Sequence, residues 1–468
     1  MRSEATLTDV AGEVRSGVKS AVSIASETLR AIEDRDEQLA AFTHVDPNLV
    51  YAQASRIDKL VESGLAVGPL AGVPMAVKDV IDVRGLPTSY GSRSFDDYVA
   101  AQDSHSVARL RDAGALIVGK TRTSEFVWGL TTPPTQNPLK PDWVAGGSSG
   151  GSAAAVGASL VAGALGTDTG GSIRIPAALC GVAGLKPTYG LVGRSGILPG
   201  HWLFDHVGPI ARSVSDLITL LSAMIGHDPG DPATDRPYAE LGPLGVPQPN
   251  PDAYLDLART RIGVFDDRLF EFVDPSLERR FHETLNRLVQ CGAELVTIRL
   301  DVLRYVVATL LAVDLPGSAG IHTDRIINRP ESIDPALLPL MRLAHRIPGV
   351  LVERAHRARR VIQTAMARTF TESRLDALVT PGLVAPPVSV GEEATRFERS
   401  DGSFESVFDA YVRPCALASV TGLPAVVIPD GLVPVPASVQ LIGRPFRDFQ
   451  LMDLARQLEK ALHSSRET

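Results

Sequence analysis

The sequence is dominated by two stretches of glycine and serine, Gly146-Gly147-Ser148-Ser149-Gly150-Gly151-Ser152 and Gly166-Thr167-Asp168-Thr169-Gly170-Gly171-Ser172. Glycine lets the backbone approach a ligand closely and adopt positive φ angles. Loops of this kind can direct several N–H groups into one space and so form an anion-binding nest. A serine hydroxyl beside such a nest is a candidate nucleophile next to an oxyanion hole.

A lysine lies upstream in an otherwise apolar segment, Val73-Pro74-Met75-Ala76-Val77-Lys78-Asp79-Val80. Burial disfavours the charged form of a lysine and lowers its pKa, which makes Lys78 a candidate general base. A lysine near the end of a strand can also extend its ammonium group to water. Only in combination with the two serine stretches does the segment favour the catalytic interpretation.

Composition points to an ordinary globular protein. The chain has 468 residues, of which 44% are hydrophobic and 21% charged, and a net charge of −8. This charge argues against nucleic acid as the main partner. The longest apolar run, Tyr305 to Val313, falls far short of the roughly 20 residues that span a bilayer. We therefore expect a cytoplasmic protein without a membrane partner, and the sequence leaves a homodimer open.

Strand-like and helical segments alternate along the chain. The strands are expected at 71–80, 115–118, 160–165, 376–381 and 424–429, and the helices at 106–112, 152–159 and 451–461. Such alternation predicts an α/β fold with helices on both faces of a sheet. We expect one domain over residues 1–468, with a core at about 68–216 and a mostly helical, variable region that lines the substrate site at about 275–375.

The motifs resemble those of the amidase signature family. The likeness is densest from Gly68-Pro69-Leu70-Ala71-Gly72-Val73-Pro74 to Asp205-His206-Val207-Gly208-Pro209, and it returns in Thr421-Gly422-Leu423-Pro424-Ala425-Val426-Val427-Ile428-Pro429. The resemblance implies a large mixed β-sheet covered by helices. It also implies hydrolysis by a Ser-Ser-Lys triad, with no cofactor and no metal.

Carried over residue by residue, the resemblance assigns the nucleophile to Ser172, the bridging serine to Ser148 and the base to Lys78. Members of the family hold the bridging serine after a cis peptide bond, which here would join Gly147 to Ser148. The oxyanion hole would be formed by backbone N–H groups of Thr169, Gly170, Gly171 and Ser172. Asp168 and Arg174 flank the nucleophile, and we interpret them as a structural pair, with Arg174 as a contact for a charged substrate as the alternative.

Two other segments match the consensus sequences of known catalytic or binding motifs. Gly114-Ala115-Leu116-Ile117-Val118-Gly119-Lys120-Thr121 fits the phosphate-loop pattern, but its apolar centre is itself strand-like, whereas a phosphate loop follows a strand. Gly146–Gly150 fits the nucleophile elbow, which would make Ser148 the nucleophile, but the elbow needs a strand directly before it. Pro138 and Pro141 make a strand there improbable. The histidines and the three cysteines show no metal-ligand spacing.

We expect the protein to cleave the C–N bond of a small neutral amide or carbamate through an acyl-enzyme intermediate. The alternative is a glutaminase or transferase subunit of a tRNA-dependent amidotransferase. Ser419 stands where those subunits usually have an asparagine, and Arg122-Thr123-Ser124 replaces their usual N-M-D. The substrate pocket should draw on Trp128, Thr131, Thr132, Trp202 and Leu203, together with Tyr305, Leu311 and Leu315 from the helical region.

Overall fold

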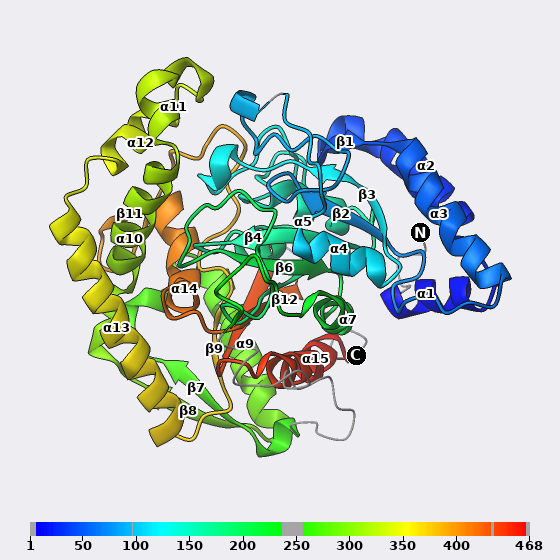
Figure 1. Cartoon of the computed structure of the whole chain (residues 1–468). Coiled ribbons are helices and arrows are strands. Elements are labelled where there is room, and N and C mark those ends of the chain that lie inside the picture. The colour runs from blue at the N-terminus through cyan, green and yellow to red at the C-terminus, as the bar shows by residue number, and fades with distance from the viewer. Residues whose placement is uncertain (1–5, 96, 236–255, 432–434, 465–468) are drawn as a thin grey trace.

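The computed structural model describes residues 6–95, 97–235, 256–431 and 435–464, and it is built around one large mixed β-sheet (Figure 1). The sheet has 11 strands in the order β1-β3-β2-β4-β6-β5-β12-β13-β9-β7-β8. The strands are β1 (Phe42–Val45), β2 (Pro74–Lys78), β3 (Leu116–Thr121), β4 (Gly163–Asp168), β5 (Ala183–Lys186), β6 (His206–Ala211), β7 (Arg261–Phe265), β8 (Glu294–Ile298), β9 (Ala377–Pro381), β12 (Ala425–Gly431) and β13 (Ala437–Gly443). β10 (Arg396–Glu398) and β11 (Phe404–Ser406) pair separately.

Helices surround this sheet. They are α1 (Leu7–Arg15), α2 (Ala21–Leu39), α3 (Pro47–Glu62), α4 (His105–Asp112), α5 (Gly150–Gly157), α6 (Arg174–Leu179), α7 (Val214–Met224), α9 (Pro275–Gln290), α10 (Val306–Ile321), α11 (Thr323–Asn328), α12 (Leu338–Ala344), α13 (Gly349–Glu372), α14 (Val407–Thr421) and α15 (Asp448–Ser464). Short 3₁₀ turns connect several of them, including η5 (Asp301–Tyr305).

Three parallel strands at the centre bring the sequence motifs to one edge. β2 pairs in parallel with both β3 and β4, so the carboxyl ends of all three strands point the same way. Lys78 is the last residue of β2, and Asp168 is the last residue of β4. Ligand sites of open α/β sheets gather outside the carboxyl ends of their strands. The lysine segment and the second glycine-serine stretch are therefore placed side by side by the sheet itself.

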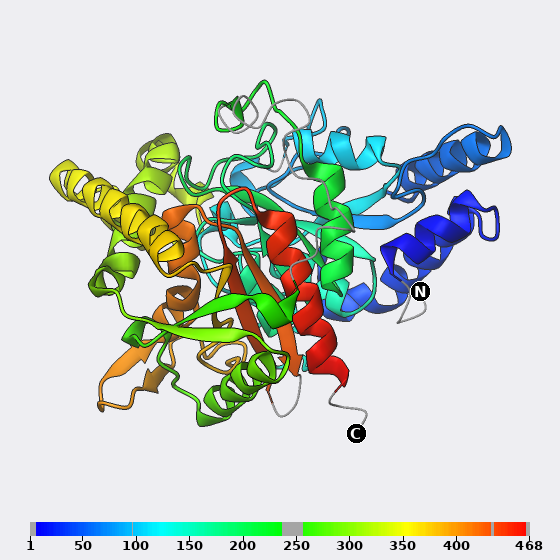
Figure 2. The ribbon, with the colours of Figure 1, turned by 90° about the horizontal axis from the view of Figure 1, so that it is seen from below.

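Helices cover both faces of the sheet, as the alternating pattern predicts. The right-handed crossovers β2–α4–β3 and β3–α5–β4 run in opposite directions along the sheet, which puts α4 and α5 on opposite faces. α7 contacts α4 and α15 on one face, and Figure 2 shows α7 in green beside α15 in red. α5 contacts α6, which packs against α14 on the other face. The predicted fold class is thus confirmed.

The region expected to be mostly helical is largely so, with one exception. α9, α10, α11, α12 and α13 fall within 275–375, and α10 to α13 lie together at the left of Figure 1. Residues 294–298, however, form β8, which pairs in parallel with β7 at the edge of the sheet. That strand is short and largely exposed, so its apolar spacing resembles that of the helices beside it. Strands from both halves of the chain join one sheet, which supports our proposal of a single domain.

One stretch has the length and apolar character of a membrane span among the residues that the structure describes. This is Asp301–Ile321, comprising η5 and α10, with a mean hydropathy of 1.4 over its most apolar window. Leu310 and Val313 of this stretch belong to a buried apolar cluster, and α10 packs against α13 and α14. Internal packing therefore covers part of this stretch, and 39% of its most apolar window is buried.

Candidate active site

Lys78 is buried and is held by two hydroxyl groups. Its Nζ lies 2.6 Å from Ser148 Oγ and 2.8 Å from Thr167 Oγ1, and the side chain is fully buried. The Gly147–Ser148 peptide bond is cis, as the resemblance implies. Ser148 lies directly before α5, and Thr167 lies in β4, so two sheet strands and one helix start converge on this amine.

The environment of Lys78 favours an uncharged amine. Burial lowers the pKa of Lys78 to about 7, while the carboxylates of Asp168 and Asp205 act in the opposite direction. Both hydrogen-bond partners of the amine are neutral hydroxyls, and no described carboxylate forms an ion pair with it. A lysine in such surroundings can act as a proton acceptor near neutral pH.

Ser172 lies in the loop after β4, next to the Ser148 loop. The Ser149 N–H donates to the Ser172 carbonyl at 3.2 Å, which joins the two loops through their backbones. Ser172 is 8% exposed, whereas Ser148 is fully buried, so of the two hydroxyls that of Ser172 is the accessible one. Among the described residues no hydrogen bond joins the Ser148 and Ser172 hydroxyls directly.

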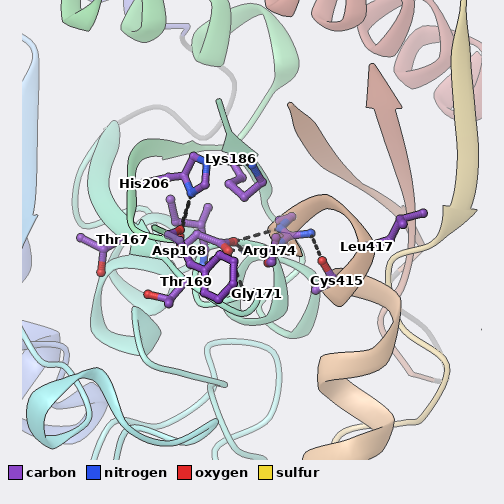
Figure 3. A network of polar contacts seen from close by, with 12 residues as sticks. Thr167, Asp168, Thr169, Gly171, Arg174, Lys186, His206, Cys415 and Leu417 are labelled. Carbon is purple, nitrogen blue, oxygen red and sulfur yellow. Dashed lines mark hydrogen bonds and ion pairs between the residues drawn. The ribbon is translucent and has the colours of Figure 1, made fainter. Parts of the chain in front are cut away.

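Asp168 and Arg174 form the structural pair that the sequence predicts. The Arg174 guanidinium donates to Asp168 through Nε and Nη2, both at 2.9 Å, and both side chains are fully buried. The remaining donors of Arg174 reach the Cys415 carbonyl, Gln440 and Ser419. Figure 3 shows Arg174 between Asp168 and the Cys415 carbonyl. With its donors occupied inside the protein, Arg174 is not placed to meet a charged substrate.

Asp168 also shapes the predicted oxyanion loop, and this corrects one assignment. Its carboxylate accepts hydrogen bonds from the Gly171 N–H at 2.9 Å and the Ile173 N–H at 3.2 Å. Gly171 has φ +133°, a conformation that favours glycine, and a Cβ there would lie 2.7 Å from Ile175 Cδ1. Because its N–H is engaged, Gly171 shapes the loop, and the candidate oxyanion donors are those of Thr169, Gly170 and Ser172.

His206 and Lys186 form a second set of polar contacts beside the Ser172 loop. His206 Nδ1 donates to the carbonyls of Phe204 at 2.6 Å and Asp168 at 3.2 Å, and its Nε2 lies 3.1 Å from Lys186 Nζ (Figure 3). Burial holds the pKa of His206 well below its usual value and lowers the pKa of Lys186 to about 7. A neutral imidazole accepting from Lys186 fits both observations.

Asp205 ties the other side of the loop to the neighbouring chain segment. The Thr169 hydroxyl donates to Asp205 Oδ1 at 2.7 Å, and the N–H groups of Gly200 and His201 donate to the same carboxylate. Both sides of the Ser172 loop are thus fixed by buried hydrogen bonds. Such preorganisation is what an oxyanion site requires.

A cavity of about 290 Å³ opens onto Ser172. Its walls come from the loop after β4, from Trp128 and its neighbours, from α10, and from Phe408 and Val412 of α14. Apart from Thr169, Ser172, Asp314 and Ser318, the side chains around it are apolar or aromatic, as in most small-molecule sites.

The predicted pocket residues fall into two groups. Trp128, Leu311 and Leu315 line the cavity. Thr131, Trp202, Leu203 and Tyr305 are not part of the lining that the structure describes. Trp202 is 53% exposed and stacks on the guanidinium of Arg194, and Tyr305 is 49% exposed. Thr132 is buried and donates to the Gly146 carbonyl, so it holds the first glycine-serine stretch.

The two competing motifs take other roles. Residues 116–121, at the centre of the phosphate-loop match, form β3. Lys120 Nζ is buried 2.9 Å from Asp79, away from solvent. The segment before Ser148 forms no strand directly ahead of it, which the elbow would require. Within the described ranges, no group of three or more His, Cys, Asp or Glu side chains is arranged to hold a metal ion.

Two site residues were missed by sequence reasoning. Thr167 stands in the quoted glycine-serine stretch, but nothing in the sequence shows that its hydroxyl meets Lys78. Asp314 lies in α10, on one helical face with Leu310, Leu311 and Leu315, and contributes a carboxyl group to the cavity wall. A single acidic residue within an apolar helical run is the signal that marks it.

Comparisons with known proteins give the family. A profile of the amidase family matches residues 23–452. An amidase from Pseudomonas putida is 36% identical over 466 residues, covering 97% of this chain and 96% of that protein. The A-type subunit of glutamyl-tRNA(Gln) amidotransferase from Chloroflexus aurantiacus is 33% identical over 477 residues, covering 96% of this chain and 94% of that protein.

A solved structure has the same fold throughout. It was reported as part of a vestigial protein complex that reveals the evolutionary origins of an s-triazine catabolic enzyme. It superposes with a TM-score of 0.89 at 31% identity and covers 98% of both chains. The chain therefore belongs to the amidase signature family and is an enzyme of that family.

Proposed function

We propose that the protein hydrolyses the C–N bond of a small neutral amide or carbamate through an acyl-enzyme intermediate on Ser172. The observation that carries this proposal is the 2.6 Å contact between the buried Lys78 amine and Ser148, beside an accessible serine. An uncharged amine next to two serines is a proton relay that can activate a hydroxyl nucleophile.

In the proposed first step, neutral Lys78 accepts the proton of Ser148 while Ser148 accepts that of Ser172. Ser172 Oγ then attacks the substrate carbonyl carbon, and the carbonyl oxygen becomes an oxyanion. This relay requires Ser172 Oγ and Ser148 Oγ to come within hydrogen-bond distance of each other. The N–H groups of Thr169, Gly170 and Ser172, in the loop whose Gly171 N–H is held by Asp168, would receive the oxyanion.

In the second step the C–N bond breaks, and the proton returns through Ser148 to the leaving nitrogen. The amine departs and leaves an ester on Ser172. Water then attacks this ester, its proton passing to Lys78 through Ser148. As the ester bond breaks, a proton returns through Ser148 to Ser172 Oγ, so that a carboxylic acid is released and Lys78 is neutral again. A carbamate would follow the same path, because its carbonyl also passes through a tetrahedral oxyanion.

A substrate panel tests this function. Aliphatic, aryl, carbamate and ester substrates would be assayed with wild type and Ser172→Ala, with melting temperature as the folding control. The proposal expects hydrolysis of amides or carbamates by wild type and loss of nearly all of it in Ser172→Ala. Equal rates in the two proteins on an amide would refute it.

A second function is favoured by the 33% identity to a glutamyl-tRNA(Gln) amidotransferase chain. In that case the protein would release ammonia from glutamine and work within a heteromeric complex. Ser419 argues against it, since its hydroxyl accepts from Arg174 where such chains usually carry an asparagine. Size-exclusion chromatography with ammonia release from glutamine and from simple amides separates the two: hydrolysis of simple amides by the chain alone supports the first.

A further inference from the structure

One carboxyl group stands in the wall of the otherwise largely apolar cavity. Asp314 of α10 lines this cavity together with Ser172, and its neighbours on the same helix face are Leu311 and Leu315. The proposed hydrolysis makes no use of Asp314. An acidic side chain among apolar ones is costly unless it has a partner. A substrate group is the partner that the cavity can admit.

Asp314 has one hydrogen-bond partner among the described residues. Ser318 Oγ lies 2.5 Å from the Gly200 carbonyl oxygen and 3.2 Å from Asp314 Oδ1. A hydroxyl has one proton, and a carbonyl can only accept, so that proton belongs mainly to the shorter contact. The longer contact with Ser318 therefore satisfies Asp314 only weakly.

Electrostatics agree with a neutral carboxyl group. The apolar surroundings raise the pKa of Asp314 to about 7, and the nearby negative charge of Asp205 adds to this effect. Asp205 itself is held by Thr169 at the nucleophile loop, so the like charge that acts on Asp314 is fixed in place. Near neutral pH a substantial fraction of Asp314 is therefore uncharged.

The second carboxyl oxygen remains for a ligand. In the part of the chain that the structure describes, Oδ1 contacts Ser318 and no hydrogen bond engages Oδ2. Asp314 therefore presents Oδ2 as a hydrogen-bond acceptor. An acceptor of this kind matches an N–H group on a neutral nitrogen, as in an amide or a urea.

We propose that Asp314 is a specificity-determining residue that accepts an N–H hydrogen bond from a second, uncharged amide-type nitrogen in the acyl portion of the substrate. This inference rests on the proposed function and names the substrate class of the same site. The substrates would be diamides or related compounds whose scissile amide lies a short chain away from another amide group.

The helix sets the distance between the two ends of such a substrate. Leu310 packs over the oxyanion loop, where its Cδ2 lies 3.7 Å from the position of a Cβ on Gly170. Asp314 follows four residues later, which is about 6 Å along the helix axis. A short acyl chain thus reaches from the Ser172 loop to the Asp314 carboxyl group.

A matched substrate pair tests the proposal. Two amides of equal length would be compared, one whose acyl chain ends in a carboxamide and one that ends in a methyl ketone, so that only the N–H donors differ. Wild type is expected to favour the carboxamide by about 10- to 100-fold in kcat/KM, because the ketone leaves Asp314 without its partner. Equal kcat/KM values for the pair would overturn the proposal.

Three variants assign the preference to Asp314. Asp314→Asn is uncharged and still presents a carbonyl oxygen, so it should keep the preference, whereas Asp314→Leu should abolish it. Leu315→Ala, on the same cavity wall, should change both substrates alike. Retention of the preference in Asp314→Leu, or its loss in Asp314→Asn, would contradict the assignment. Melting temperatures show whether each variant is folded.

A third substrate tests the charge of Asp314. The activity of the wild-type protein shows whether the proposed function or only the role of Asp314 fails. An acyl chain ending in an ammonium group should be hydrolysed less well than the carboxamide; a preference for the ammonium would mean that Asp314 acts as a carboxylate and would overturn the neutral form. A wild-type protein that hydrolyses neither amides nor carbamates would refute the proposed function itself. Hydrolysis without discrimination between the paired substrates would refute only the role of Asp314.

Discussion

The strands and helices around Ser172 differ sharply from the helices that form the far wall of its cavity. All six residues of α6 are buried, and so are seven of the eight residues of α5. By contrast, α12 contributes Leu340 to the cavity lining and carries exposed apolar side chains, Leu340 and Leu343. Substitutions in the tightly packed first region are expected to disturb the fold, whereas the exposed positions of the second region tolerate them. The chemistry is therefore expected to reside in the first region and the choice of substrate in the second.

Asp168 and Asp314 show the same difference between the loop that holds Ser172 and the outer wall of the cavity. Asp168 is fully buried and accepts hydrogen bonds from the Arg174 guanidinium and from three backbone N–H groups, and its pKa is lowered to about 2. Asp314 has one weak contact to Ser318, and its pKa is raised to about 7. A satisfied ion pair builds the loop that holds the nucleophile. A carboxyl group with a free oxygen is available to a ligand.

The largest expected effect is that of Ser172→Ala. Removing the nucleophile should lower kcat on an amide by at least about 10⁴-fold, as loss of a catalytic serine does in other hydrolases. Because Ser172 lies in a loop and the change removes one oxygen atom, the melting temperature should stay close to that of wild type. Activity within about 10-fold of wild type would show that the chemistry lies elsewhere.

Two buried lysines on neighbouring strands give a sharper comparison. Lys78→Met removes an amine that has only hydroxyl partners. It should lower kcat/KM by at least about 10³-fold and lower the free energy of unfolding by about 1 kcal/mol. Lys120→Met leaves Asp79 buried without its partner, so it should lower the free energy of unfolding by about 3–5 kcal/mol. Denaturant unfolding and kcat/KM, measured on both variants, check this. Equal effects on stability would contradict an uncharged Lys78.

Arg174→Met should damage the loop that Asp168 holds. The variant leaves a buried carboxylate without its guanidinium, which typically costs about 3–5 kcal/mol. Unfolding in denaturant measures the loss. A change below about 1 kcal/mol would mean that the other partners of Asp168 suffice to hold it.

The smallest effect is expected on the outer helices. Leu343 is 67% exposed and lies outside the cavity lining, so Leu343→Ser should change stability by no more than about 0.5 kcal/mol and leave kcat/KM unaltered. Size-exclusion chromatography of the same variant tests whether this face joins two copies of the chain. A shift from dimer to monomer would show that the exposed side chains of these helices form an interface.

Local patterns predicted the central elements well, because glycine loops and apolar runs reflect backbone requirements. The segments 115–118, 152–159 and 376–381 match β3, α5 and β9 to within a few residues. The order of the strands depends on contacts between distant segments, as in the antiparallel pairing of β5 with β12, and no local pattern encodes it.

The sequence also did not predict which side chains point into the cavity and which point to solvent. Trp202 is aromatic, as many pocket-lining residues are, yet it is exposed and stacks on Arg194. Val18 fits the apolar spacing of the helix that begins at Ala21, yet it precedes that helix and is 77% exposed. The contacts of Thr167 and Asp314 arise only when β4 and α10 meet the rest of the fold.

The most direct test of an uncharged Lys78 as base is the pH dependence of kcat/KM on a neutral amide, measured in wild type and in Asp314→Asn. A protonated Lys78 cannot accept a proton, so activity should be lost as pH falls through its pKa of about 7. We predict a tenfold rise per unit below about pH 7 and a plateau above it, in both proteins. A level profile from about pH 5 to about pH 9 would contradict the account.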